Sequence, residues 1–446
     1  MAREQILDKQ LDGRGSFAVV ATDGSGHYPT IALAISAGIK KIRLKNGTHI
    51  VTGSIFNIPA GVELEGETKD GVIIDATPST RITTGTDTKI SNLTFKFPSL
   101  GLNIPFFSSG SRTIIESVLF ENTVASLGPI AQIKSNSIAN NISFNGPVDG
   151  NGTSVFYIDE SVVSNIDINV TNIPTFYATA VLVTGGANVN NVYIRGGTTS
   201  GGALKAIKSA GRGGNVNNVT VVPLNNGIYG DLIEAQSTPL NINNFHFISN
   251  GSATVTFISN LVSGTTQSNI SNFKFGGQTS AQRLTVNKTV SDLFYLTGGI
   301  AGVYNNISFR NINYNTIGTV NYLFKNDGGL AETLNISNIE FIDIVVSAGL
   351  RGIIFAGLNT LMNGVSVQRV SLTTGGGPFD LESLVYMDGV NSIFTNFKFE
   401  VPGVWGSALR IAQDAGLTRK NNRVSNGIFY NGSNSNFPIN RFIVEA

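Results

Sequence analysis

The sequence Asn141-Ile142-Ser143-Phe144 is one copy of a four-residue pattern (asparagine, apolar, any residue, apolar) that recurs along the chain. We call this pattern the Asn phrase and its first residue the anchor. With weaker copies included, the anchors are Asn92, Ser117, Asn141, Asn165, Asn191, Asn218, Asn244, Asn272, Asn306, Asn338, Gly364, Asn396 and Gly427. Successive anchors differ by 24 residues at the closest (141 to 165) and by 34 at the widest (272 to 306). A loose repeat of this size predicts a solenoid in which each turn buries its apolar face by stacking on the next.

Alternation within the Asn phrase assigns its side chains to two faces of a strand. The positions one and three after the anchor are apolar in nearly every copy, so we expect them to face inward; in the last copy they are Ile428 and Tyr430. The position between them follows no apolar rule and is expected to face outward. This outward column consists of Thr94, Leu119, Ser143, Asp167, Tyr193, Thr220, His246, Lys274, Ser308, Glu340, Ser366, Lys398 and Phe429.

A second short apolar segment lies ahead of most anchors, as in Val155–Ile158, Ala180–Val183 and Leu384–Met387. The connection to the anchor often carries paired glycines, for example Gly185-Gly186. Several short strands and tight turns per repeat indicate a parallel β-helix, because a propeller blade needs four antiparallel strands, usually in about 40 or more residues.

The start of the chain does not follow the repeat. Ile31, Ala34 and Ile35 have helical spacing. Thr30 fits an N-cap and Gly38 fits a helix end, so we expect a short helix between them. Such a helix would plug the open end of the solenoid core and protect its first edge.

Around this helix the order is Asp23-Gly24-Ser25-Gly26, the helix, a strand, Asn46-Gly47-Thr48, a strand, and residues 58–66, Ile-Pro-Ala-Gly-Val-Glu-Leu-Glu-Gly. Over residues 19–75 this order resembles the start of the right-handed parallel β-helix of the pectin-lyase-like superfamily, pectin methylesterases included. The resemblance implies an all-β fold, a single-stranded right-handed parallel β-helix with a short N-terminal capping helix. We expect an attachment segment or a disordered tail at 1–22, the start of the β-helix at 23–75, its coils at 76–430 and an end segment at 431–446.

Composition argues against several functions. The net charge is +1 and 13% of residues are charged, which gives no indication of nucleic acid or an anionic membrane as partner. Cysteine is absent, so disulfides and thiolate metal sites are not available, and we expect neither a metal site nor a cofactor. The N-terminus lacks an apolar signal-peptide core and no run reaches membrane-spanning length, which disfavours a Sec-secreted enzyme and membrane insertion.

Asparagine suits the anchor because it tolerates the left-handed backbone of a sharp corner and its amide both donates and accepts. Stacked about 4.8 Å apart, successive amides can bond along the ladder and satisfy polar groups that the corner would bury. We therefore interpret the anchors as corner residues rather than as a sugar- or metal-binding array. The Asn-x-Ser/Thr triplets follow from the same chemistry rather than from glycosylation.

The catalytic motifs of the enzymes that the chain resembles are missing. Pectin methylesterases carry blocks such as Gln-Asp-Thr-Leu and Asp-Phe-Ile-Phe-Gly, whereas here Gln413-Asp414 continues as Ala415-Gly416. The calcium and arginine motifs of pectate lyases and the paired-Asp and Gly-His-Gly blocks of polygalacturonases are also absent. No catalytic residue is carried over from these families.

The chain also resembles phage tailspikes, whose glycan-hydrolysing members cut with Asp/Glu pairs that share no motif. Asp327 and Asp388 follow the second strand two anchors apart, which places them on the order of 9.5 Å from each other, the upper end of the range for inverting hydrolysis. We predict them as the catalytic pair, with solvated turn acids as the alternative. Two further acidic pairs occupy the same general column: Asp159 with Glu160, and Asp231 with Glu234.

Two aromatic residues are predicted to bind glycan. Trp405, the only tryptophan, fits either stacking on a sugar ring or burial at a subunit interface. Tyr193 lies in the outward column. Together with outward Leu119 and Phe429, it indicates that part of the surface is covered, most simply by neighbouring chains. The three histidines are spread too widely through the repeat to make an obvious site.

These observations favour a bacteriophage virion protein of tailspike or tail-fibre type. It would be a β-helical homotrimer that binds host cell-surface polysaccharide and joins other virion proteins through its N-terminal segment. Two alternatives stay open: a tailspike-type polysaccharide depolymerase, glycoside hydrolase or lyase, and a non-enzymatic spike or decoration protein of a capsid. We expect function where the repeat is interrupted, at the wide steps 272–306 and 306–338, at 364–396 and at the ends.

Overall fold

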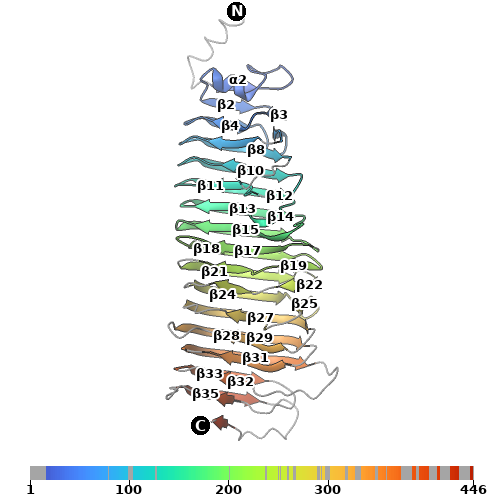
Figure 1. The fold of residues 1–446 in the computed structure, drawn as a ribbon, viewed down its shortest axis with the longest axis vertical. Coiled ribbons are helices and arrows are strands. Elements are labelled where there is room, and N and C mark those ends of the chain that lie inside the picture. Colours follow the sequence, from blue (N-terminus) through green and yellow to red (C-terminus); the bar gives the residue numbers. More distant parts are fainter. Residues whose placement is uncertain are drawn as a thin grey trace, which may run out of the picture. The chain divides into compact units, whose positions relative to one another are not determined.

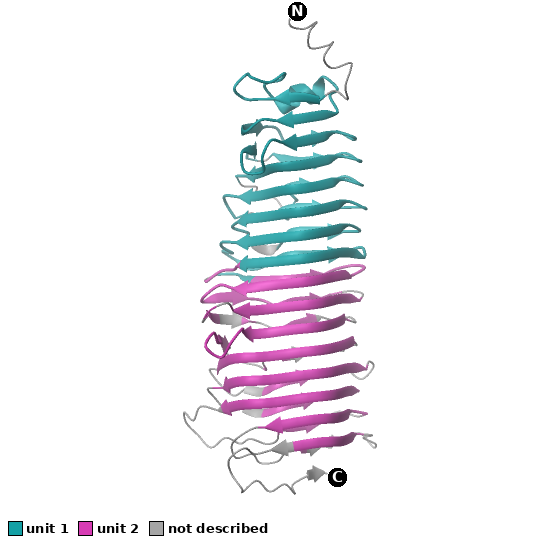
Figure 2. Cartoon of the chain, turned by 180° about the vertical axis from the view of Figure 1, so that it is seen from behind, with its two compact units in different colours: residues 1–195, 200–203 teal, residues 196–199, 204–446 magenta. Residues whose placement is uncertain are grey.

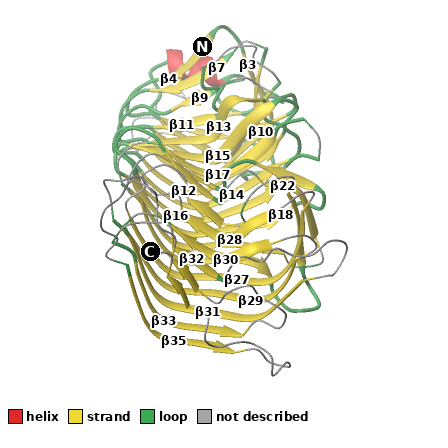
Figure 3. Cartoon of the chain, turned by 60° about the horizontal axis from the view of Figure 1, so that its bottom comes forward, coloured by secondary structure: helices red, strands yellow, loops and turns green. Residues whose placement is uncertain are grey.

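The computed structural model describes residues 17–78, 80–98, 104–125, 128–199, 201–236, 239–249, 251, 253–258, 261–264, 268–288, 292, 294–296, 302–316, 320–326, 333–346, 350–357, 359–372, 384–387, 391–400, 409–411, 422–430 and 442–444. The chain divides into unit 1, residues 1–195 with 200–203, and unit 2, residues 196–199 with 204–446 (Figure 2). Strands dominate both units (Figure 3). They pair in parallel, rung upon rung, so the predicted all-β parallel solenoid is confirmed.

The described elements of unit 1 are β1 (Phe17–Val20), α2 (Ile31–Ser36), β2 (Lys41–Leu44), β3 (Gly47–Val51), β4 (Ile55–Ile58), β5 (Glu63–Gly66), β6 (Val72–Ala76), β7 (Arg81–Thr84), β8 (Lys89–Phe97), β9 (Phe107–Ser108), β10 (Ile114–Asn122), β11 (Ala131–Ile133), β12 (Ile138–Gly146), β13 (Gly150–Asp159), β14 (Val162–Val170), β15 (Phe176–Thr184) and β16 (Ala187–Gly196), whose last residue falls in unit 2.

The described elements of unit 2 are β17 (Ala203–Ser209), whose first residue falls in unit 1, β18 (Gly214–Pro223), β19 (Gly227–Tyr229), β20 (Ile233–Ala235), β21 (Leu240–Ser249), β22 (Ala253–Ile258), β23 (Val262–Gly264), β24 (Ser268–Gly277), β25 (Leu284–Lys288), β26 (Phe294–Leu296), β27 (Gly302–Thr316), β28 (Val320–Asn326), β29 (Leu334–Val346), β30 (Leu350–Ala356), β31 (Thr360–Leu372), β32 (Val385–Met387), β33 (Ile393–Glu400), β34 (Leu409–Ile411), β35 (Arg423–Tyr430) and β36 (Phe442–Val444).

The helix α2 forms where the sequence predicts it. Thr30 is its N-cap, and the Thr30 hydroxyl accepts a hydrogen bond from the N–H three residues on at 3.3 Å. Gly38 follows the helix with a φ of 78°, the left-handed ending that glycine permits. Ile31 and Ala34 are buried. Strand β1, which falls inside the predicted attachment segment, pairs in parallel with β2.

The Asn phrase forms one strand on each rung. In unit 1, β8, β10, β12 and β14 pair in register, so Ile142 lies between Val118 and Ile166. In unit 2, β18, β21, β24, β27, β29, β31, β33 and β35 pair in the same way (Figure 1). The residues one and three positions after the anchor are buried from the copy at Asn92 to the copy at Asn396, which confirms the two inward columns.

The anchors are corner residues, as predicted. From position 92 to position 396 all have a left-handed backbone, with φ between 54° and 74°. Their amides bond along the ladder: Asn191 Nδ2 donates to Asn165 Oδ1 at 3.0 Å, and Asn306 Nδ2 donates to Asn272 Oδ1 at 2.9 Å. These bonds are exposed, so the ladder organises a surface edge and does not rescue buried polar groups.

Phenylalanine stacks along the core of unit 2. The rings of Phe309 and Phe341 are 5.0 Å apart and inclined by 9°, and those of Phe247 and Phe275 are 5.1 Å apart and inclined by 17°. This spacing matches the strand spacing of about 4.8 Å, so each ring stacks on the next without leaving its rung. A second parallel sheet of unit 2 contains β26, β28, β30, β32, β34 and β36.

The last anchor is Asn426, so the prediction of Gly427 is wrong by one residue. Asn426 has a φ of 54°, and its amide donates to Asn396 Oδ1 at 3.3 Å. Gly427 takes the inward position beside Phe397. A Cβ on Gly427 would lie 1.7 Å from Phe397 Cζ, because that ring fills the space of a side chain.

The shift moves the strand register of the following residues by one position. Ile428 pairs with outward Lys398 and is 61% exposed, so the prediction that it faces inward is wrong. In the strand register, Phe429 pairs with Phe399 and Tyr430 pairs with Glu400.

The chain itself covers the surface over Leu119. The Lys69 carbonyl accepts a hydrogen bond from Thr94 Oγ1 at 2.8 Å, and Lys69 Nζ donates to Ser143 Oγ at 2.8 Å. Thr94 and Ser143 pair with Leu119 from the rungs before and after it. Lys69 therefore spans this position, and a neighbouring chain is not required to cover it.

Candidate functional site

The outward column of unit 2 carries a groove. Lys274, Ser308, Glu340 and Ser366 occupy this column on β24, β27, β29 and β31, and parallel pairing places them side by side. Two shallow cavities of about 320 Å³ each flank the row and share Lys274, Ser308 and Glu340. We call these two cavities together the unit 2 groove.

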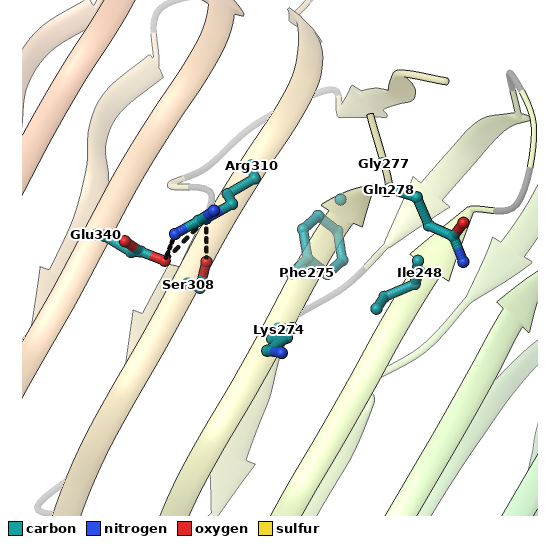
Figure 4. Close-up of a pocket in the computed structure, with 9 residues that line it drawn as sticks. Ile248, Lys274, Phe275, Gly277, Gln278, Ser308, Arg310 and Glu340 are labelled. Carbon is teal, nitrogen blue, oxygen red and sulfur yellow. Dashed lines mark hydrogen bonds and ion pairs between the residues drawn. The ribbon is translucent and has the colours of Figure 1, made fainter. Parts of the chain in front are cut away.

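Arg310 forms one wall of the groove. Its Nε donates to Ser308 Oγ at 3.0 Å and to Glu340 Oε1 at 2.8 Å, and its Nη2 donates to the same Glu340 oxygen at 2.5 Å (Figure 4). Lys274 lies on the adjacent strand. Charge-assisted hydrogen bonds of this length fix the guanidinium against the carboxylate, so this wall is held in one geometry.

The anchor amides form the opposite wall. Asn272, Asn306 and Asn338 line the second cavity. Asn272 Nδ2 donates to Asn243 Oδ1 at 2.9 Å, and Asn306 Nδ2 donates to Asn272 Oδ1, also at 2.9 Å. Among the described residues, each of these two amides therefore keeps a second N–H for a ligand. Gly364 follows Asn338 on the next rung, where a Cβ would lie 2.8 Å from Asn338 Oδ1. The absence of a side chain there keeps this end of the groove open.

Strong ion pairs continue beyond the groove. Arg369 Nε and Nη2 donate to the two carboxylate oxygens of Asp343 at 2.5 and 2.7 Å. Arg283 Nη1 donates to the Asp343 carbonyl at 3.0 Å. The hydrogen bonds from Arg369 hold the pKa of the Asp343 carboxyl below its usual value, so this acid is ionised and paired with Arg369.

Tyr193 of unit 1 is held by its neighbours on the strand surface. The Arg195 guanidinium carbon lies 5.6 Å from the centre of the Tyr193 ring. Arg195 Nη2 in turn donates to both oxygens of Asp167, at 3.0 and 2.8 Å. The tyrosine is 36% exposed. An oriented, partly exposed ring of this kind is suited to stacking on a ligand.

Three of the predicted site residues lie outside the described part of the chain. These are Asp327 and Asp388, the predicted catalytic pair, and Trp405, the predicted sugar-stacking residue. They stay predictions.

Asp159 and Glu160 of unit 1 lie at a rung turn. Burial, and then the charge of Glu160, raise the pKa of the Asp159 carboxyl above its usual value. Gly185 lies against this carboxyl, since a Cβ on it would be 2.3 Å from Asp159 Oδ1. A raised carboxyl pKa is the direction that a general acid needs, so this pair stays a prediction among the acidic pairs.

Asp231 and Glu234 of unit 2 are held by lysines. Lys205 Nζ lies 2.7 Å from Glu234 Oε2 and 3.8 Å from Asp231 Oδ2, and Lys208 Nζ lies 3.6 Å from Glu234 Oε2. The side chains of Lys205 and Glu234 are 14% and 11% exposed. Because each charge has a partner at this depth, we interpret the cluster as structural.

The histidines do not converge. His49 is buried, and its Nε2 lies 2.9 Å from the Lys45 carbonyl, whereas His27 Nδ1 accepts the Val19 N–H at 3.0 Å. Within the described ranges, no group of three or more His, Cys, Asp or Glu side chains is arranged to hold a metal ion. No helix in the same ranges is long and apolar enough to cross a membrane.

Sequence reasoning placed the residues of the groove but did not recognise them as a site. Lys274, Ser308, Glu340 and Ser366 were all assigned to the outward column, which showed no rule of its own. The available signal was charge, because Lys274 and Glu340 stand in one column of a chain with 13% charged residues. The groove also lies on the rungs of the two wide steps where we expect function.

Known proteins offer limited comparison. No protein-family model matches the sequence, and no curated protein matches it. Similar solved structures include a variant of the catalytic domain of GH87 alpha-1,3-glucanase in complex with nigerose, with 11% identity, a TM-score of 0.38, and 87% of this chain and 68% of that chain covered. Another is the tailspike protein of E. coli bacteriophage HK620 in complex with pentasaccharide, with 11% identity, a TM-score of 0.34, and 96% and 79% covered. These identities are too low to transfer a site residue to this chain.

Proposed function

We propose that the unit 2 groove binds a polysaccharide and that the chain is a tailspike- or tail-fibre-type protein of a bacteriophage virion. The observation that carries the proposal is the pair of adjoining cavities that share Lys274, Ser308 and Glu340 on strands paired in register. Linked sugar rings present hydroxyls at regular intervals, and a row of amides, a hydroxyl and charged groups on rigid strands offers them donors and acceptors at fixed positions.

A variant that fills the groove tests this proposal. Ser366 lies at the groove edge in the outward column, so Ser366→Trp should block binding of host capsular polysaccharide or lipopolysaccharide and leave the melting temperature unchanged. Thr285→Trp is the matched control, because Thr285 is a half-buried strand residue outside the groove. Biolayer interferometry on immobilised glycans measures both. Equal binding by both variants and the wild type would remove the groove as the site.

We also propose that the chain forms a homotrimer. Ile114, Ile138 and Val162 stand in register on three consecutive rungs of unit 1 and are 43%, 54% and 43% exposed. Exposed apolar side chains aligned on consecutive rungs favour contact with another chain, and homo-oligomers usually close with cyclic symmetry. Copies of the same chain, with the same stripe, are the occupants that we propose.

The virion location rests on the predicted attachment segment, residues 1–22, which would bind other virion proteins. Labelling phage particles with an antibody to this chain and imaging them distinguishes a tail appendage from a capsid spike.

Cleavage of the bound polysaccharide is the alternative function. Its test is the appearance of new reducing ends, which Asp327→Asn and Asp388→Asn should abolish if these residues are the catalytic pair.

A further inference from the structure

Lys274, the first residue of the row that lines the unit 2 groove, has no acidic partner among the described residues. Neighbouring cations on this surface are paired: Arg310 with Glu340, Arg369 with Asp343, and Lys398 with Glu400 at 4.0 Å. Lys274 is exposed and lines both cavities. Within the described part of the chain, no carboxylate lies within ion-pair distance of Lys274 Nζ. Its three donors are therefore available to a ligand.

The charges of the groove sum to a positive value. Its charged lining residues are Lys274, Arg310 and Glu340, two cations and one carboxylate, so the net charge is +1. The Glu340 carboxylate is bound by the guanidinium of Arg310, which leaves the lysine charge uncompensated. On the preceding rung, burial and then Lys274 hold the pKa of His246 below its ordinary value.

Most polar groups beside Lys274 donate hydrogen bonds. Ser308 Oγ accepts from Arg310 Nε, so its own O–H points elsewhere and can donate. Asn272 and Asn306 each keep one amide N–H, as described above. A cation surrounded by donors matches an anionic group, whose oxygens only accept.

We propose that Lys274 binds an anionic substituent of the polysaccharide, a carboxylate as in a uronic acid or a phosphate, so that the groove selects acidic glycans. This inference rests on the proposed function, since it names the class of glycan that the same groove takes. The neighbouring amides and Ser308 bond the remaining oxygens of the anion and the adjacent hydroxyls.

Binding of three defined polymers to the full-length protein tests this inference. Polygalacturonate carries carboxylates, its fully methyl-esterified form carries none, and a phosphomannan carries phosphate. The wild type should bind polygalacturonate or phosphomannan at least tenfold more tightly than the ester, and the preference should weaken with salt. Binding of one charged polymer and not the other identifies the source of the anion.

Lys274→Met should weaken binding of the charged polymer about fivefold to tenfold, in the range of one charge-assisted contact, and leave binding of the ester unchanged. Lys398→Met is the matched control, because Lys398 lies in the same column but has a carboxylate partner. A second readout is the NMR titration of His246, whose pKa should rise when an anion neutralises Lys274.

The outcomes separate the two proposals. If Lys274→Met weakens binding of charged and esterified polymers equally, or if the wild type does not prefer the charged ones, the proposal that the groove selects anionic glycans is overturned. The proposal that the groove binds glycan would still stand. A wild type that binds none of these polymers, but binds a neutral host polysaccharide in the groove, also overturns the anionic class. A wild type that binds no polysaccharide at all overturns both.

Discussion

Substitution at Asn165 separates the two roles of an anchor, its backbone conformation and its amide. Asn165 has a φ of 55°, its Nδ2 donates to Asn140 Oδ1 at 2.8 Å, and its Oδ1 accepts from Asn191 Nδ2 at 3.0 Å. Asn140 lies in strand β12 and is not among the residues with positive φ. Asn140 takes part in the same side-chain hydrogen bond but does not have a left-handed backbone, so it is the matched control.

The expected magnitudes follow from these contacts. Asn165→Ala removes two exposed hydrogen bonds, about 0.5 kcal/mol each, and places an alanine in a left-handed conformation, which costs roughly 1–2 kcal/mol. The free energy of unfolding should therefore fall by about 2–3 kcal/mol. Asn165→Gly loses the same bonds and about 0.5 kcal/mol of backbone entropy, about 1.5 kcal/mol in total. At Asn140 the order of the two variants reverses, because Asn140→Ala should lower the free energy of unfolding by about 0.5 kcal/mol and Asn140→Gly by about 1 kcal/mol.

Urea denaturation followed by far-UV circular dichroism measures these differences for the four variants and the wild type. The decisive result is the reversal: glycine should be the better replacement at 165 and alanine the better one at 140. If alanine is as good as glycine at 165, the anchor is selected for its amide and not for its corner conformation, and the explanation of the repeat is refuted.

Substitutions at four further positions test other parts of the structure. Tyr193→Ala should weaken glycan binding about threefold to tenfold if Tyr193 stacks on sugar, whereas Tyr193→Phe should retain it; biolayer interferometry measures both. Ile138→Lys should lower the molar mass in light scattering toward that of one chain if the stripe with Ile114 and Val162 joins the copies; a retained trimer would remove the stripe from the interface. Asp159 has a folded-state pKa above its unfolded value of 3.8, so the folded state binds more protons just above pH 3.8 and stability falls as pH rises through that window; Asp159→Asn should abolish this fall in urea titrations across that pH range. Glu234→Gln should cost about 2 kcal/mol, less than the 3–5 kcal/mol of a fully buried pair, because it leaves Lys205 and Lys208 without their shared carboxylate; an unchanged denaturation midpoint would argue against a structural role.

The fold could be predicted from the sequence because each turn of the solenoid repeats the same local requirements. The error at the last anchor shows the limit of this reasoning. Both Asn426 and Gly427 are acceptable corner residues, and Gly364 had shown that glycine can replace asparagine. The choice is made by Phe397, whose ring needs a glycine beside it on the next rung. Side-chain volume on a neighbouring turn is invisible to a pattern along the chain.

The site was harder to predict for a related reason. The Arg310–Glu340 pair joins residues 30 positions apart in sequence, and Arg310 reaches a serine on its own strand at the same time. The register brings these rungs together, but side-chain direction decides the pairing. Tyr193 illustrates this as well: the sequence predicted an exposed aromatic residue, and only the structure shows that Arg195 and Asp167 orient it.

The repeat leaves few positions free for chemistry. Inward residues must be apolar and anchors must accept a left-handed backbone, so variable polar groups are confined largely to the outward column and the turns. The step from 272 to 306 is 34 residues and that from 338 to 364 is 26, yet both keep the column in register. Differences in loop length are therefore absorbed away from the row, at a small cost in loop entropy. Insertions can reshape the surroundings of the groove while Lys274, Ser308 and Glu340 stay aligned, so ligand class is expected to follow the outward column and not the loops.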